Sequence, residues 1–212
     1  MSKMSKIKVG IIGIGNCAKS LVEGIQYYKA NPEDKVGLMY DSIGGYTVDE
    51  IEFVVGFDVD RRKVNKPLVD ALRAAPNCAM DHVEEILENG SNTAGCIKKG
   101  AMVYSGPELD GVAPHMLDYP EEVSFRTGAD TALSKKQVAD KLNFHKVDVV
   151  INYLPVGSEK ATEFYMAACL EAGCHFVNCI PTLIETNKSK LVEQSFIAVS
   201  YTHLTLPTNR EV

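Results

Sequence analysis

Short apolar runs alternate with segments of helical spacing along most of the chain. Five apolar runs predict strands, at Lys8–Ile12, Ile51–Asp58, Met102–Ser105, Val147–Leu154 and His175–Ile180. Apolar residues spaced three or four apart predict helices, at Asn16–Lys29, Lys66–Ala74, Asp81–Asn89, Leu133–Leu142 and Glu159–Ala172. Alternating strands and helices form a parallel sheet covered by helices on both faces. The pattern therefore predicts an α/β fold with a doubly wound parallel sheet.

Residues 30–50 interrupt this alternation after the first helix. Pro32, Gly37 and the pair Gly44–Gly45 are typical of turns, so this insertion is predicted to be mostly loop. Asp130 and Thr131 precede the helix expected at residue 133, and their side chains are of the kind that caps helices.

The first predicted strand runs directly into a glycine turn. Val9–Ala18 reads V-G-I-I-G-I-G-N-C-A and contains G-x-G-x-x-A at Gly13, Gly15 and Ala18. Gly13 allows the tight turn, and Gly15 leaves no side chain where a pyrophosphate approaches the backbone. The N–H groups that start the next helix favour a phosphate. This context predicts a Rossmann-type dinucleotide site, the alternative being a plain strand-to-helix turn.

Asp58 ends the second predicted strand. A carboxylate at this position usually accepts hydrogen bonds from the adenosine ribose, and it lies about 20 residues beyond the glycines when no insertion intervenes. Its charge would repel a 2′-phosphate and so favours NAD over NADP. Arg61 and Arg62 could instead bind such a phosphate, and a solvated turn is the remaining interpretation.

A loop rich in turn residues, 153–158, follows the fourth predicted strand. Ligands of open α/β sheets bind at the carboxyl ends of strands, so we expect this loop to border the nicotinamide or its phosphate. Pro155 and Gly157 would stiffen the loop, and Ser158 would cap the next helix. A simple strand-to-helix connection would look similar.

Composition narrows the class of protein. The net charge of −6, without a basic stripe, argues against a nucleic-acid partner, and no apolar run approaches the roughly 18 residues of a membrane span. The six cysteines are scattered, which favours free thiols and a cytoplasmic location. Cys169, Cys174 and Cys179 recur every five residues, a spacing that differs from zinc motifs, so we expect core thiols and no metal site.

Several segments are more specific than a general dinucleotide motif. They are G-I-G-N-C-A-K-S-L-V-E-G-I-Q-Y-Y at 13–28, F-D-V-D at 57–60, G-P-E-L-D-G-V at 106–112, Y-L-P-V-G-S at 153–158 and A-G-C-H-F-V-N-C-I-P-T at 172–182. Together with the insertion, they resemble the prokaryotic and archaeal branch of the myo-inositol-1-phosphate synthase family, also called inositol-3-phosphate synthase. The resemblance covers most of residues 7–185, and residues 61–145 match least.

The resemblance implies an NAD-dependent isomerase that converts D-glucose 6-phosphate to 1D-myo-inositol 3-phosphate for inositol and phospholipid biosynthesis. The cofactor oxidises the sugar and later reduces it again, so the reaction has no net redox change. The resemblance also implies the contacts of NAD. The pyrophosphate would lie at Gly13, Ile14, Gly15, Asn16 and Cys17, the ribose at Asp58, and the nicotinamide end at Tyr153, Leu154, Pro155 and Ser158.

The resemblance stops after residue 182. The family continues with a G-D-D-I-K-S-Q segment and an α+β domain that carries the catalytic residues and forms a homotetramer. Residues 199–212 instead resemble translated sequencing-adapter sequence, the alternative being a short divergent natural end. We therefore expect residues 1–196 to form the NAD-binding domain and residues 197–212 a non-native, disordered tail. A chain of this kind is expected to bind NAD without synthase activity.

Two other functions stay open. A sugar dehydrogenase of the glucose–fructose oxidoreductase type would share the Rossmann pattern, but such enzymes continue into an E-K-P segment with a functional lysine. Here Asn178-Cys179-Ile180-Pro181 occupies that place. The second possibility is a module that binds NAD without catalysing a reaction.

Overall fold

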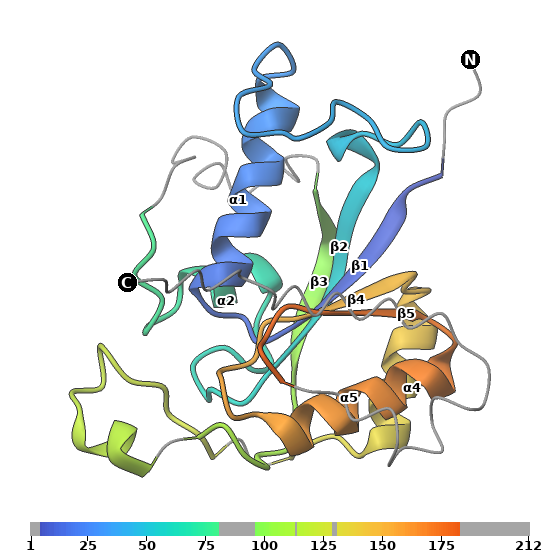
Figure 1. The fold of residues 1–212 in the computed structure, drawn as a ribbon. Coiled ribbons are helices and arrows are strands. Elements are labelled where there is room, and N and C mark those ends of the chain that lie inside the picture. Colours follow the sequence, from blue (N-terminus) through green and yellow to red (C-terminus); the bar gives the residue numbers. More distant parts are fainter. Residues whose placement is uncertain (1–4, 81–95, 113, 129–130, 183–212) are drawn as a thin grey trace, which may run out of the picture.

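Five parallel strands form the central sheet of the computed structural model, which describes residues 5–80, 96–112, 114–128 and 131–182 (Figure 1). The strands are β1 (Ile7–Ile12), β2 (Ile51–Asp58), β3 (Ile97–Ser105), β4 (Val149–Asn152) and β5 (His175–Asn178). Their order across the sheet is β3-β2-β1-β4-β5, and all neighbouring pairs are parallel. This is the strand order of a Rossmann-type sheet, with its switch point between β1 and β4. The predicted fold class is therefore confirmed.

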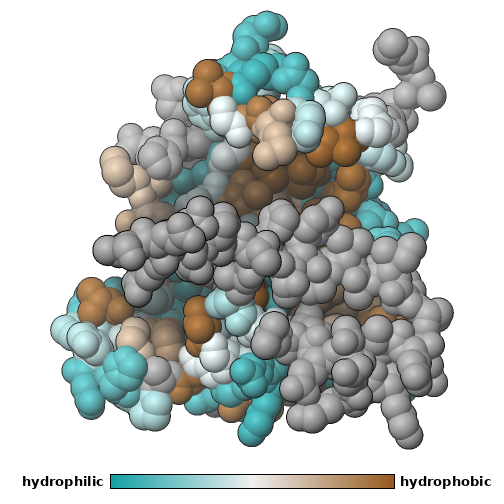
Figure 2. Space-filling view, viewed as in Figure 1, coloured by the Kyte–Doolittle hydropathy of each residue, from teal (hydrophilic) through white to brown (hydrophobic). Residues whose placement is uncertain are grey.

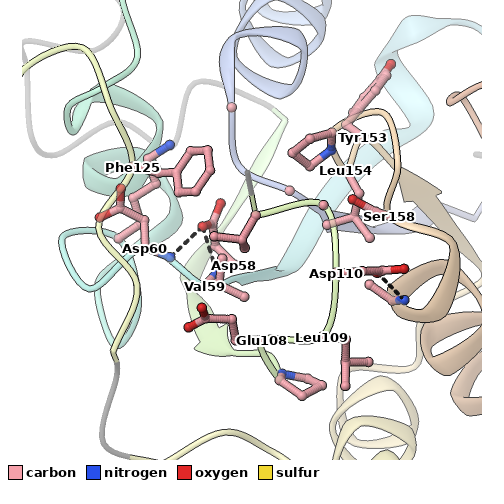
Figure 3. A pocket seen from close by; sticks show the side chains of 18 of the residues that line it. Asp58, Val59, Asp60, Glu108, Leu109, Asp110, Phe125, Tyr153, Leu154 and Ser158 are labelled. Atoms are coloured by element: carbon pink, nitrogen blue, oxygen red, sulfur yellow. Dashed lines mark hydrogen bonds between the residues drawn. The ribbon is translucent and has the colours of Figure 1, made fainter. Parts of the chain in front are cut away.

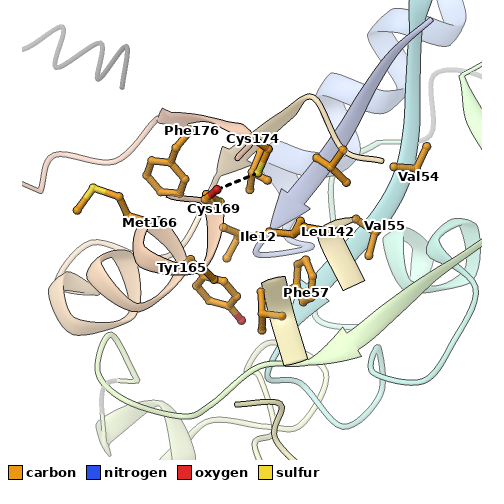
Figure 4. Packing of buried hydrophobic residues seen from close by; sticks show 14 residues of the cluster. Ile12, Val54, Val55, Phe57, Leu142, Tyr165, Met166, Cys169, Cys174 and Phe176 are labelled. Carbon is orange, nitrogen blue, oxygen red and sulfur yellow. Dashed lines mark hydrogen bonds between the residues drawn. The ribbon is translucent and has the colours of Figure 1, made fainter. Parts of the chain in front are cut away.

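Helices cover both faces of this sheet (Figure 1). The helices are α1 (Asn16–Ala30), α2 (Leu68–Arg73), α4 (Lys135–His145) and α5 (Glu159–Ala172), with short 3-10 turns η1 (Val48–Glu50) and η2 (Pro114–Asp118). On one face Val9 and Ile11 pack with residues of α1 and α2. On the other face Ile12 and Phe57 pack with residues of α4 and α5 such as Leu142 and Tyr165 (Figure 4). Since side chains alternate across a strand, neighbouring residues of β1 serve two separate cores.

Local patterns predicted most elements but misplaced some of their ends. The bounds of β2 and α5 are as predicted, whereas β3 begins five residues earlier than expected. The helix predicted at residue 133 begins at Lys135, and its cap is Ser134, not Thr131. Ser134 N–H donates to Gln137 Oε1 at 2.8 Å, and the Ser134 hydroxyl accepts from the Gln137 amide at 3.4 Å. The helix predicted at 81–89 and the tail predicted at 197–212 lie outside the described residues.

The insertion between α1 and β2 is a loop, as predicted, and two tyrosines of α1 hold it. The hydroxyl of Tyr27 donates to Asp34 at 2.6 Å, and that of Tyr28 donates to the Val36 carbonyl at 2.6 Å. The loop ends at η1, where Thr47 and Glu50 form a capping box. Figure 2 shows polar and apolar side chains side by side at the top of the molecule, and Val36, Met39, Tyr40 and Ile43 of this loop are exposed. The Tyr27–Tyr28 pair thus has a structural role.

The three evenly spaced cysteines do not share one environment. Cys169 and Cys174 are buried, and the Cys174 thiol donates to the Cys169 carbonyl with a donor–acceptor distance of 3.7 Å (Figure 4). Cys179 is exposed, so the expectation of a core thiol is wrong there. The described residues contain no group of three side chains suited to a metal ion. Among them, no helix is both long enough and apolar enough to span a bilayer.

Candidate dinucleotide site

A cavity of about 200 Å³ lies at the carboxyl edge of the sheet (Figure 3). Eight of the ten predicted site residues line it: Gly13, Gly15, Asn16, Asp58, Tyr153, Leu154, Pro155 and Ser158. Ile14 and Cys17 do not line it, because the Ile14 side chain is buried among α1 and α2, and Cys17 is exposed on α1. The fold thus gathers most of the predicted residues around one cavity, at the switch point where such sheets bind ligands.

The two glycines of the turn differ in their surroundings. Gly13 has a φ of +81°, and a Cβ there would lie 2.8 Å from the Tyr153 carbonyl oxygen. A Cβ at Gly15 would meet nothing within 4 Å. The fold itself therefore requires glycine at position 13. It does not require glycine at position 15, where the open space beside the backbone suits a ligand.

The peptide groups on either side of Ile14 are held from two directions. The Ile14 N–H donates to Asp58 Oδ2 at 2.7 Å. Its carbonyl accepts from the Lys63 ammonium at 2.7 Å and from the Asn77 amide at 3.0 Å. These bonds tie the turn to the end of β2 and to the segment after α2, so its orientation is set before any ligand arrives.

Asp58 lies at the carboxyl end of β2, as predicted. Its Oδ1 accepts from the backbone amides of Val59 at 2.7 Å and Asp60 at 2.8 Å (Figure 3). With the Ile14 bond, three of the roughly four acceptor positions of a carboxylate are in use. One acceptor position is left, which is enough for a ribose hydroxyl.

The two arginines after β2 are engaged with carboxylates. The Arg62 guanidinium donates two hydrogen bonds to the Asp60 carboxylate, from Nε to Oδ1 at 2.9 Å and from Nη2 to Oδ2 at 2.6 Å. Burial of Asp60 disfavours its charge, but the hydrogen bonds from Arg62 and from the Arg126 amide outweigh burial and hold the pKa of Asp60 below its usual value. Arg61 pairs with Glu121 at 3.2 Å on the surface. Arg62 therefore uses most of its donors within the protein, whereas the exposed Arg61 guanidinium makes one contact and keeps other N–H donors.

The start of α5 is capped by a residue from another loop. Ser158 stands at the N-cap position, but its hydroxyl makes no capping bond, is buried and has no partner, so the predicted cap is wrong. Instead, the Asp110 carboxylate accepts from the amides of Lys160 at 2.7 Å and Ala161 at 3.0 Å. A Cβ at Gly111 would lie 1.9 Å from Ser158 Oγ, so only glycine lets the two loops approach. Asp110 thus fastens loop 106–112 along the cavity wall.

Removing this cap should loosen the cavity wall. Asp110→Ala is expected to lower the free energy of unfolding by about 1 kcal/mol, the usual cost of a lost N-cap. Asp110→Asn keeps an acceptor oxygen and should lose less. Urea unfolding followed by circular dichroism measures both. Equal stability of Asp110→Ala and the parent chain would show that the cap is not needed.

Buried polar side chains shape the loops after β4 and β5. Asn152 donates to Asn178 at 2.9 Å and to Thr162 at 3.1 Å, and its carbonyl oxygen accepts from the Leu154 amide at 3.2 Å. All three side chains of this network are buried.

Tyr153 lies in the loop after β4. Burial and the neighbouring Cys179 thiol raise the pKa of Tyr153 to about 12, so Tyr153 is protonated at neutral pH.

Sequence reasoning missed several residues of the cavity wall: Asp60, Lys63, Pro76, Asn77, Glu108, Leu109, Asp110, Gly111, Val112, Phe125 and Tyr165. The sequence marks segment 106–112 only as part of the resemblance and predicts no role for it. Strand order, glycine turn and cavity together define an α/β domain of the Rossmann type.

No family model matches the chain, but individual relatives do. The inositol-3-phosphate synthase of Corynebacterium glutamicum is 40% identical over 186 residues, which is 86% of this chain and 46% of that protein. The inositol-3-phosphate synthase of Mycobacterium tuberculosis is 37% identical over 185 residues, 86% of this chain and 45% of that protein. The chain is thus a relative of the inositol-3-phosphate synthases, as its motifs predicted, and it spans about half the length of these curated relatives.

Solved structures agree with the fold. The crystal structure of Ari2 matches with a TM-score of 0.64 and 26% identity, over 85% of this chain and 47% of that chain. A myo-inositol-1-phosphate synthase-related protein from Thermotoga maritima matches with a TM-score of 0.57 and 19% identity, over 84% of this chain and 49% of that chain. At 19% identity, the second match supports only the similarity of the fold.

Proposed function

We propose that this chain binds NAD in the cavity at the carboxyl edge of the sheet, as the dinucleotide-binding part of an inositol-3-phosphate synthase. The contrast between the two glycines carries the proposal: the fold requires Gly13, whereas no protein atom requires glycine at position 15, which lines the cavity and leaves its backbone open to a ligand. The names of the relatives support the same assignment.

The residues around the cavity fit such a ligand. The backbone of 13–17 would hold the pyrophosphate, because the first N–H groups of α1 have no acceptor within the helix. The remaining acceptor position of Asp58 would bind the ribose. The nicotinamide end would lie along residues 153–158, where the buried Ser158 hydroxyl lacks a partner.

For a protein of the relatives' full length we propose the conversion of D-glucose 6-phosphate to 1D-myo-inositol 3-phosphate. Bound NAD would supply reversible hydride transfer, so that the reaction has no net redox change. The described residues would orient the cofactor, and we assign none of them a catalytic role. A cytoplasmic homotetramer of the full-length protein stays a prediction.

Cofactor preference tests the role of Asp58. Calorimetric titration of the chain is expected to show tighter binding of NAD than of NADP, because the Asp58 carboxylate repels a 2′-phosphate and Arg62 is already paired with Asp60. Asp58→Asn removes the charge and should reduce the ratio of the two affinities about tenfold, or about 1.4 kcal/mol. Asp70→Asn, on the exposed side of α2, is the matched control. Equal or tighter NADP binding by the parent chain would overturn the assignment.

A further inference from the structure

A buried lysine lies directly behind the glycine turn. Lys63 is 3% exposed, lines the cavity, and donates from Nζ to the Ile14 carbonyl at 2.7 Å and to Asn77 Oδ1 at 2.8 Å. In the part of the chain that the structure describes, no carboxylate lies within ion-pair distance of this ammonium. Two of its three N–H donors are therefore used, and both acceptors are neutral.

The position of this charge calls for an explanation. An ammonium removed from water without a close counter-ion is unfavourable. The Asn77 amide already donates to the Ile14 carbonyl, so a cation is not needed merely to satisfy that oxygen. The carboxylates of Asp58 and Asp60 favour the charge from further away, and burial lowers the pKa of Lys63.

The hydrogen bond of Lys63 also sets the direction of the next N–H group. Because a trans peptide is planar, the Ile14 carbonyl and the Gly15 N–H point in opposite directions. Holding the carbonyl toward Lys63 turns the Gly15 N–H away from it. That N–H has no hydrogen-bond partner among the described residues. Lys63 thus fixes a free donor in the turn where the pyrophosphate is proposed to bind.

We propose that Lys63 is a positioning residue of the dinucleotide site: it orients the Ile14–Gly15 peptide toward the ligand and places a positive charge that offsets the charge of the pyrophosphate. This inference rests on the proposed NAD binding. It states that Lys63 strengthens binding of the pyrophosphate, the negatively charged part of the ligand, rather than binding of the adenine or nicotinamide ring.

Calorimetric titration of the 212-residue chain with NAD and with ADP-ribose tests the proposal. Lys63→Met is expected to weaken both affinities at least tenfold at neutral pH. Lys66→Met, three residues further on and exposed, should leave them unchanged. Lys63→Arg should retain most of the affinity, because a guanidinium also donates to a carbonyl and carries the charge.

The pH profile separates a charge effect from a purely structural one. As pH rises through the lowered pKa of Lys63, the ammonium loses its proton, so NAD affinity of the parent chain should fall. Asp58, Asp60 and Arg62 are the charged groups facing Lys63, and the thiols Cys17 and Cys78 lie on the neighbouring α1 and the segment after α2. Lys63→Arg retains all of these groups, and its profile should be flat over the range where the parent's affinity falls.

The outcomes are distinct. Absence of NAD binding by the folded parent chain would overturn the proposed function and this inference with it. If the parent chain binds NAD and Lys63→Met binds it with the same affinity and the same pH profile, the inference is overturned and the proposed function stands. If Lys63→Met does not fold, the comparison of the parent chain with Lys63→Arg decides: equal pH profiles would overturn the role of the charge.

Discussion

Gly13→Ala is expected to destabilise the chain severely, whereas Gly15→Ala should leave it folded and remove most of its NAD binding. At position 13 a methyl group would lie 2.8 Å from the Tyr153 carbonyl oxygen, in backbone that has a φ of +81°. We expect a loss of about 3 kcal/mol or more in the free energy of unfolding. At position 15 the methyl group meets no protein atom and fills only the space assigned to the pyrophosphate. Urea unfolding and NAD titration measure the two effects separately.

Gly44→Ala is the matched control for backbone strain. Gly44 lies in the insertion with a φ of +59°, and a Cβ there would meet nothing within 4 Å. Its replacement should cost only about 1 kcal/mol, because strain is present without a clash. A Gly13→Ala protein no less stable than Gly44→Ala would contradict the packing argument. Undiminished NAD affinity in Gly15→Ala would mean that the ligand does not approach there.

Asn152→Ala is expected to lower the free energy of unfolding by about 3 kcal/mol. The substitution removes three hydrogen bonds of a buried network, to Thr162, Asn178 and the Leu154 amide, and each is worth about 0.5–1.5 kcal/mol. For a chain of this size the midpoint of thermal unfolding should fall by about 10 °C. Differential scanning calorimetry gives this value directly.

NAD binding should also weaken in Asn152→Ala, because the Asn152 side chain holds the start of loop 153–158. Asn143→Ala, on the exposed face of α4, is the control and should change stability by less than about 0.5 kcal/mol. If both variants unfold at the same temperature, the buried network does not support the fold as argued.

Local sequence patterns predicted the elements whose signals are continuous. β2 is apolar except for Glu52 and its final Asp58, α5 has a regular helical period, and both have the predicted bounds. The apolar pattern predicts too short a β3, because two lysines and a glycine interrupt its first half, I-K-K-G-A. Of the added residues Ile97 pairs with Phe53 of β2, a long-range contact, and residues 98–101 lie in the irregularity before Met102 pairs with Val55.

Charged residues were the hardest to interpret from the sequence. Arg61, Arg62 and Lys63 follow one another in a stretch that reads as a solvated turn. In the structure each has a different partner: Glu121 on the surface, buried Asp60, and the Ile14 carbonyl. Asp110 likewise caps a helix that begins 49 residues further along the chain, a partnership that no local pattern reveals.

The sequence by itself determined the alternation of strands and helices, the glycine turn, the carboxylate that ends β2 and the relationship to the inositol-3-phosphate synthases. These features depend on residues that are close together in the chain, where periodicity and backbone preference act. Only the tertiary structure decided which side chains meet. The strand order places β4 beside β1, and this brings the loop 153–158 to the glycine turn. The folded sheet also brings Lys63 to the Ile14 carbonyl and Asp110 to the start of α5. Such contacts join residues that are far apart in the chain, so they form only in the tertiary structure.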